Sequence, residues 1–326
     1  MTRMRSSSFV LISLSSLLTG CAGSSDATKA TWEPQQERLY VQRKKDNAET
    51  LARQQAYEKA LLDLDRLMDR YIQAVWSLGN DRADRQALTL EKAIHDIVLE
   101  HFAELMRSAI EADQGQNRAI AIASLGFSQR PEAIDALLNG LTASSPQIAG
   151  NAALALGILR DPRTPLAGLT DLAMTERSSD ELIEKPKDEM RRTASWALLR
   201  LQPALNDRNG LAKVWPKILA TPVDKLDPGV AVHALRGIGL LRDKNLVGIA
   251  LPYASHPMPK VREAAAIALG MLGNPTAVET LLALLGTAEA NQNVRLAARK
   301  ALMALAGNVD LGFDVAEWRK VFQRGV

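Results

Sequence analysis

Few side chains in this chain could take part in covalent or metal chemistry. Cys21 is the only cysteine, and the four histidines are His95, His101, His233 and His256. A single cysteine allows neither an internal disulfide nor a cysteine metal cluster. His95 and His101 are too far apart in sequence to share a helical face, as a pair four residues apart would. The chain also lacks a glycine-rich phosphate loop, a His-Glu-x-x-His motif and a Gly-x-Ser-x-Gly motif. We therefore expect no catalytic residue, cofactor or metal ligand.

The residues before Cys21 have the order of a secretory signal. Arg3 and Arg5 make a basic start, Phe9–Leu18 is an apolar run, and small residues precede the cysteine. The apolar run is about half of the roughly 20 residues that a membrane-spanning helix needs. Residues 1–20 are therefore predicted to be a cleaved signal peptide rather than a transmembrane helix.

The sequence around Cys21, Leu18-Thr19-Gly20-Cys21, resembles the lipobox of bacterial lipoproteins. The resemblance implies cleavage before Cys21, a lipid on its sulfur and acylation of the new amino end. Several acyl chains hold a protein firmly at a membrane, whereas one holds it only marginally. Lipoproteins of the inner membrane often have Asp after the cysteine. Ala22 stands there in this chain, so the resemblance implies an outer-membrane, periplasm-facing protein. The alternative is an ordinary cleaved signal with an unrelated cysteine.

The composition favours an α-helical, globular body. Hydrophobic residues make up 47% of the chain and aromatic residues only 4%, and Ala and Leu, which are abundant, have the highest helix propensities. Removal of residues 1–20 takes away Arg3 and Arg5 and no acid, so the 40 basic residues fall nearly to the 37 acidic ones. A near-neutral body is a poor match for nucleic acid, whose binding depends on neutralised phosphates. We therefore expect no nucleic-acid partner.

Two segments precede the main body of the chain. Residues 21–32 are small and polar, which suits a lipidated cysteine with a flexible tether. Residues 33–112 are predicted to form a helical hairpin, because two apolar stripes with helical spacing flank a Gly-Asn-Asp break at residues 79–81. The stripes are Tyr57, Leu61, Leu64, Met68, Tyr71, Val75 and Leu78, and then Leu90, Ile94, Ile97, His101, Leu105 and Ala109.

An internal repeat defines residues 113–326. VREAAAIALGMLG from Val261 aligns without a gap to VRLAARKALMALA from Val294, and four earlier copies share the pattern. One position is Ala in all six copies: Ala121, Ala152, Ala194, Ala234, Ala265 and Ala298. The segments between copies leave room for one more helix each: residues 131–142, 164–174, 208–220, 244–254 and 275–286. Stacked helix pairs of this kind form a solenoid, and Trp318 and Phe322 are expected to cap its end.

The repeat resembles the HEAT-like repeats of the phycobilisome-lyase type. Val261-Arg262 and Val294-Arg295 match the typical Val-Arg opening of the second helix, whereas Ala149 and Ala231 depart from it. The resemblance covers about residues 115–305 and implies an all-α fold: an N-terminal helical hairpin followed by a HEAT-like α-solenoid of about six helix pairs. Di-iron hydroxylases of this fold use His-Glu pairs, which are absent here. Bilin lyases act in the cytoplasm, whereas this chain is expected to be exported, so we expect no enzyme.

The solenoid surface is the remaining candidate for function. We call the positions equivalent to Glu263 and Ile267 in the six second helices the second-helix ladder. It consists of Ala119/Ala123, Gly150/Leu154, Arg192/Trp196, Val232/Arg236, Glu263/Ile267 and Leu296/Lys300. Because Trp and Arg are enriched in binding hot spots, Arg192, Trp196 and Arg236 are expected to be its main contacts. The predicted partner-binding residues are Leu154, Arg192, Trp196, Arg236, Ile267 and Lys300.

These features predict an interaction scaffold of the cell envelope whose protein partner is acidic with an apolar anchor. Four alternatives stay open: the hairpin itself covers the ladder, the ladder is a bare surface, the chain is a structural spacer, or it is a lyase-like accessory enzyme. The charged insertion Thr175–Asp188 is expected to be a solvated loop, with partner binding as its alternative role.

Overall fold

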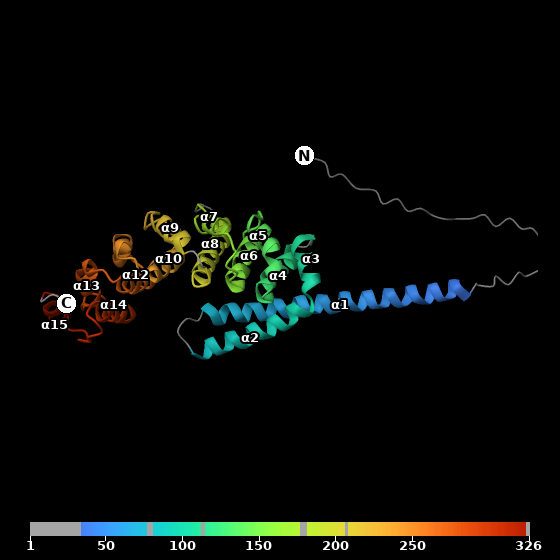
Figure 1. The fold of residues 1–326 in the computed structure, drawn as a ribbon, viewed down its shortest axis with the longest axis horizontal. Helices are drawn as coiled ribbons and strands as arrows, with labels where there is room; N and C mark the ends of the chain where they lie inside the picture. The colour runs from blue at the N-terminus through green and yellow to red at the C-terminus, as the bar shows by residue number, and fades with distance from the viewer. Residues whose placement is uncertain (1–33, 77–80, 112–114, 177–180, 206–207, 324–326) are drawn as a thin grey trace, which may run out of the picture. The chain divides into compact units, whose positions relative to one another are not determined.

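A computed structural model describes residues 34–76, 81–111, 115–176, 181–205 and 208–323. Every regular element within these ranges is a helix (Figure 1). Cys21, the signal peptide and the tether lie outside the described residues, so what we expect of them stays a prediction. Residue contacts divide the chain into two compact units at Arg53 and Gln54. None of the described helices is both long enough and apolar enough to cross a membrane.

Helix α1 runs from Pro34 to Trp76 and changes character along its length. In the first unit its large apolar side chains, such as Leu39 and Leu51, are exposed, as expected for a charged stretch with little to bury. In the second unit, from Ala60 onward, one face of α1 is buried. The buried side chains of that face follow the predicted stripe: Leu61, Leu64, Met68 and Tyr71.

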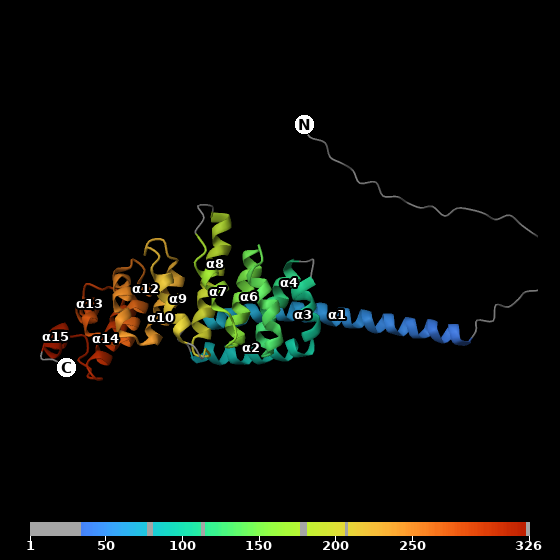
Figure 2. The same cartoon turned by 45° about the horizontal axis from the view of Figure 1, so that its top comes forward.

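The second stripe forms two helices instead of the single helix expected. Helix α2 spans Asp81–Glu100 and α3 spans Phe102–Glu111, and they separate at His101. The His101 amide still donates to the Ile97 carbonyl at 3.1 Å, so the chain bends there without losing its backbone hydrogen bonds. Figures 1 and 2 show the second half of α1 beside α2, as a hairpin requires, and α3 leaving the line of α2. The reason for the bend is tertiary: α3 packs on α4 as the first helix of the first repeat.

Six helix pairs follow one another in chain order within the described part of the second unit (Figure 2). The second helices are α4 (Gly115–Leu125), α6 (Pro146–Leu159), α8 (Glu181–Leu201), α10 (Pro228–Leu241), α12 (Pro259–Leu272) and α14 (Gln292–Leu305). After α3, the first helices are α5 (Ile134–Leu141), α7 (Leu166–Ala173), α9 (Arg208–Leu219), α11 (Val247–Ala250) and α13 (Val278–Leu285). Short 3-10 turns flank three of them: Pro131–Ala133, Lys244–Leu246 with Leu251–Ser255, and Pro275–Ala277. The predicted solenoid is therefore confirmed.

The repeat register is confirmed by burial. The shared alanine is completely buried in all six copies, among them Ala265. Five residues further on, several copies have a glycine that touches the next second helix. A Cβ added to Gly270 would lie 2.7 Å from Ala301 Cα, and one added to Gly126 would lie 2.5 Å from Ala155 Cα. Only glycine fits such a close approach between helices, so small side chains set the stacking distance.

Four copies have an arginine at the second position of the Val-Arg opening, where Arg118 follows Asn117 and Arg191 follows Met190, and each arginine ties its second helix to the end of the preceding helix. Arg118 Nε donates to the Ala109 carbonyl at 3.0 Å, and Arg295 Nε donates to the Leu285 carbonyl at 3.0 Å. Arg191 donates to the Thr175 carbonyl, which follows α7. Arg262 donates to the His256 carbonyl, which follows the 3-10 turn after α11. The last carbonyls of a helix lack partners within it and attract cations. These arginines therefore fix the turn of each pair.

The charged insertion of the third repeat is helical over much of its length, contrary to the expected loop. Helix α8 begins at Glu181 and continues through Pro186 into the repeat. Inside it, the buried Arg191 guanidinium binds the carboxylates of Glu184 and Asp188, the latter at 2.6 Å. Glu184 and Asp188 lie seven and three residues before Arg191 and therefore on the same side of the helix. Their ion pairs with Arg191 stabilise the helical conformation of this charged segment.

The C-terminal helix α15, Val315–Gln323, closes the stack as predicted. Its Trp318 is completely buried, and the indole Nε1 donates to the Gly312 carbonyl at 3.0 Å. The Phe322 ring stacks on it at a centroid distance of 6.2 Å. A terminal repeat needs such a cover because no further repeat buries its open side.

Candidate partner-binding surface

The first half of the second-helix ladder faces α1 across a cavity. A cavity of about 720 Å³ separates α1 from α4, α6 and α8, and ladder residues of all three helices line it, Leu154 and Arg192 among them. From α1, the cavity is lined by Asp65, Met68, Asp69 and Ile72. Leu154 is only 7% exposed. For these repeats the structure therefore places α1 of the hairpin in front of the ladder, across this cavity.

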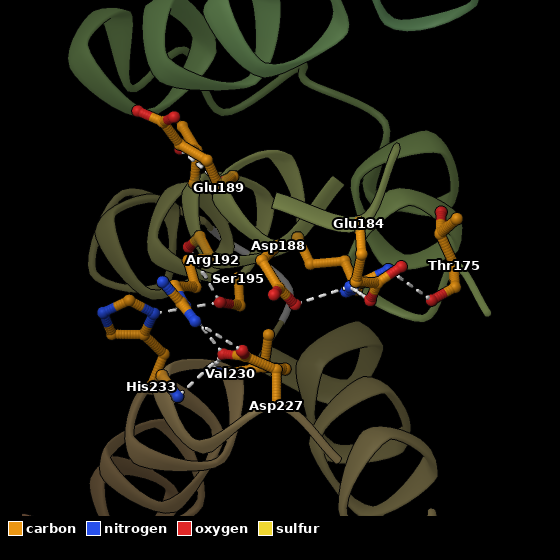
Figure 3. A network of polar contacts seen from close by, with 12 residues as sticks. Thr175, Glu184, Asp188, Glu189, Arg192, Ser195, Asp227, Val230 and His233 are labelled. Carbon is orange, nitrogen blue, oxygen red and sulfur yellow. Dashed lines mark hydrogen bonds and ion pairs between the residues drawn. The ribbon is translucent and has the colours of Figure 1, made fainter. Parts of the chain in front are cut away.

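Arg192, at the middle of the ladder, is engaged within the chain (Figure 3). Its guanidinium makes a two-pronged contact with the Asp227 carboxylate, with Nε–Oδ1 at 2.9 Å and Nη2–Oδ2 at 2.8 Å. Asp227 also accepts hydrogen bonds from the Gly229 and Val230 amides and so caps α10. Burial raises the pKa of Asp227, but the hydrogen bonds and charge of Arg192 outweigh it and hold the pKa below its ordinary value. This pair fastens α8 to α10.

Ser195 and His233 form a second link between α8 and α10 (Figure 3). Ser195 Oγ lies 2.9 Å from His233 Nδ1 and 2.9 Å from the Arg192 carbonyl of its own helix. Burial lowers the pKa of His233 to about 4, and the nearby charge of Arg236 adds to the effect. A serine beside a histidine suggests a nucleophile, but Ser195 is completely buried. The geometry assigns the pair to helix packing.

Trp196 is half-buried, so it is less accessible than expected of a main contact. A Cβ added to Gly157 of α6 would lie 2.7 Å from Trp196 Cζ3, which shows how closely the indole packs on the preceding repeat. On the other side, the Arg200 guanidinium lies 5.6 Å from the indole centroid, within cation–π range. Arg236, the third expected contact, is also half-buried. The side chains at the centre of the ladder therefore make mainly intramolecular contacts.

The last two rungs of the ladder line an open groove. We call this groove, about 550 Å³ in volume, the α12–α14 groove. Ile267 and Lys300, both predicted to bind a partner, line it together with Leu296, which is 38% exposed. Met271 adds apolar surface and Arg242 adds a second cation. At the end where α12 and α14 begin, Glu263 and Asn293 line the groove. Of the predicted residues, Ile267 and Lys300 therefore have the most open surroundings.

Met271 and Arg242 were missed by the sequence reasoning. Met271 lies one helical turn beyond Ile267, so extending the ladder by four residues in each copy would have found it. That third position is Phe127, Ile158, Arg200, Leu240, Met271 and Ala304 in the six copies. Arg242 has no such signal, because it lies outside the ladder positions: it ends α10 in a left-handed conformation, with φ of 55°.

The groove has the composition of a recognition surface. Aliphatic side chains and two cations, Arg242 and Lys300, line it together, which suits a protein segment with an apolar anchor and acidic neighbours. Among the described residues there is no cluster of three or more His, Cys, Asp or Glu side chains placed to hold a metal ion.

The chain belongs to the HEAT repeat family. The family pattern matches residues 99–181 and 216–303, which together make up just over half of the chain. The first matched stretch begins shortly before α3, in agreement with the role of α3 as the first helix of the first pair. Among curated proteins, no sequence matches this chain.

Solved structures of other proteins show limited similarity. The complex of CpcE and CpcF of phycocyanin lyase from Nostoc sp. PCC7120 is 20% identical, with a TM-score of 0.40, and the match covers 68% of this chain and 93% of that one. Human deoxyhypusine hydroxylase in complex with glycerol is 18% identical, with a TM-score of 0.28, and the match covers 81% of this chain and 96% of that one.

Proposed function

We propose that this HEAT repeat protein is a lipid-anchored scaffold of the bacterial cell envelope that binds a protein partner and catalyses no reaction. Stacked helical repeats present extended surfaces for protein recognition, and membership of the family makes a protein partner the first expectation. One observation carries the proposal: α1 lies over the first half of the second-helix ladder, whereas the α12–α14 groove is open and combines an apolar floor with two cations.

The anchor is the second part of the proposal. The lipobox-like sequence that ends at Cys21 supports acylation of that cysteine, and Ala22 supports the outer membrane, with the body facing the periplasm. The small polar residues after Cys21 would let the solenoid stand clear of the lipid surface. Within this proposal, the partner is an envelope protein that the scaffold holds near the membrane.

Site-specific photo-crosslinking in living cells tests the groove. A photoreactive residue at Leu296, which is exposed in the groove, should crosslink one defined partner. The matched control is the same residue at Ala283, which is exposed on α13 and does not line the groove. The crosslink from position 296 should weaken at least tenfold when Ile267 is replaced by Asp, because a buried carboxylate opposes an apolar anchor. Equal products from positions 296 and 283, or no product from 296, would refute the groove as the binding site.

A further inference from the structure

We infer that the occupant of the α12–α14 groove is an acidic amphipathic α-helix of the partner, which repeats the chemistry that α1 presents to the other half of the ladder. This inference rests on the proposed function and specifies its ligand. Helix α1 serves as a guide to this ligand, because the ladder positions of the first three copies already face α1 in the described structure.

Helix α1 shows what the ladder accepts. Its Met68 and Ile72 are apolar and four residues apart, and its Asp65 and Asp69 are acidic and also four residues apart. All four line the cavity in front of α4, α6 and α8, where Lys185 joins Arg192 as a cation of the opposite wall. Residues four apart share a helical face, so the surface that α1 offers is both apolar and acidic.

The repeat provides equivalent positions for a second helix. Phe127 is the third ladder position of the first copy, and the Tyr71 ring of α1 meets it edge-on at a centroid distance of 5.0 Å. Met271 is the same position in the fifth copy, and it lies on the wall of the α12–α14 groove. Thioethers pack well on aromatic rings. A large apolar residue of the partner helix should therefore rest on Met271 as Tyr71 rests on Phe127.

The positive charge of the α12–α14 groove favours an acidic helix as its ligand. Arg242 and Lys300 line the groove, and both are exposed, while Glu263 is the one acid in its lining. Neither cation is in an ion pair that the described structure shows, in contrast to Arg192 with Asp227. Carboxylates four residues apart on a partner helix, spaced like Asp65 and Asp69, would meet these two cations and orient the helix in the groove.

A synthetic peptide of residues 57–75 of this chain is the probe, because it carries the apolar and acidic face of α1. Labelled with fluorescein, it should bind the full chain, measured by fluorescence anisotropy. A short isolated helix is marginal in water, so the peptide should gain helical circular dichroism on binding. Replacing Arg242 and Lys300 together by Glu should weaken binding at least tenfold. Replacing the exposed Lys213 of α9 by Glu should leave it unchanged.

A charge exchange makes the test specific. A peptide with Lys in place of Asp65 and Asp69 should bind the native chain weakly and recover affinity on the Arg242→Glu, Lys300→Glu variant. Equal peptide affinity for the native chain and the Arg242→Glu, Lys300→Glu variant would overturn the inference. Such a result would mean that the peptide replaces α1 at the other half of the ladder. Binding without helix gain would overturn it as well.

The two proposals can fail separately. If position 296 still crosslinks a partner in cells while the peptide fails to bind, the groove is a binding site whose ligand is not an acidic helix. If position 296 crosslinks nothing, the proposed function falls, and the inference falls with it. A crosslinked partner peptide that is acidic and loses the crosslink on charge reversal at Arg242 and Lys300 supports both.

Discussion

His233 is the residue whose chemistry is most altered by the fold. Its imidazole is held between α8 and α10, and burial, with the charge of Arg236, lowers its pKa from 6.5 to about 4. The unfolded chain therefore binds a proton between about pH 6.5 and pH 4 that the folded chain does not. Under that condition the free energy of unfolding rises with pH, so stability is complete above about pH 6.5 and falls as the pH drops toward 4.

Replacing His233 by Asn should remove this contribution, because Asn has no proton to gain and its side-chain oxygen can take the place of Nδ1 beside Ser195. From pH 7 to pH 4 the native chain should lose on the order of 2–3 kcal/mol more stability than the variant. Urea unfolding at a series of pH values measures it. Some slope should remain, since burial also lowers the pKa of His256. Parallel curves for the two proteins would contradict the assignment.

The residues predicted to bind a partner have different surroundings in the structure, for a physical reason. Ile267 and Lys300 line an open groove because, within the described ranges, no other helix lines it beyond α12 and α14 and the end of α10. Leu154 has the same position in its copy, but α1 faces it across a cavity. Arg192 has the other ladder position, and Asp227 binds it. Helical periodicity tells which face a side chain occupies. It does not tell which distant segment of the chain will occupy that face.

At the scale of helices, glycine sets how closely neighbouring repeats approach. Gly270→Ala should destabilise the protein by about 1–3 kcal/mol, because the new Cβ would meet Ala301 at 2.7 Å and the helices would have to separate. Gly248→Ala is the matched control: it lies in helix α11 with no atom within 4 Å of an added Cβ. There the same change should stabilise by about 0.5–1 kcal/mol through helix propensity.

Thermal unfolding of the two variants checks the repeat register directly. The expected result is a lower melting temperature for Gly270→Ala and an equal or higher one for Gly248→Ala. If both variants shift in the same direction, the stacking of α12 on α14 does not depend on the missing side chain.

The helices themselves were largely predictable, and the exceptions have tertiary causes. All five predicted first-helix segments contain the observed helices, and the alanine register identified the second helices, because both signals are local and repeated along the chain. The bend at His101 was not visible, since the apolar stripe runs through it unbroken and only packing on α4 turns α3. The start of α8 at Glu181 was also missed, because the charges that suggested a loop pair with the buried Arg191.

At the scale of the whole molecule, the proposed anchor at Cys21 would decide where in the cell the groove operates. The Cys21→Ser variant should take up no lipid label and should no longer fractionate with membranes, because Ser has no sulfur for a thioether. Metabolic labelling with a clickable palmitate, followed by membrane fractionation, measures both. The matched control is Ser24→Ala, which alters a nearby residue and should change neither result. Label retained on the Cys21→Ser variant would contradict lipidation at this position.

Because α1 faces only the first half of the ladder, repeats can be added to the other half without changing the contacts of α1. Each repeat contacts mainly its neighbours, and α1 faces α4, α6 and α8 across the cavity that it lines. Duplicating the pair α13–α14 ahead of the α15 cap would therefore add one more rung to the exposed surface and leave the hairpin undisturbed. Evolution could lengthen or shorten the proposed partner-binding surface beside α15, one helix pair at a time, while the repeats beside the hairpin stay the same.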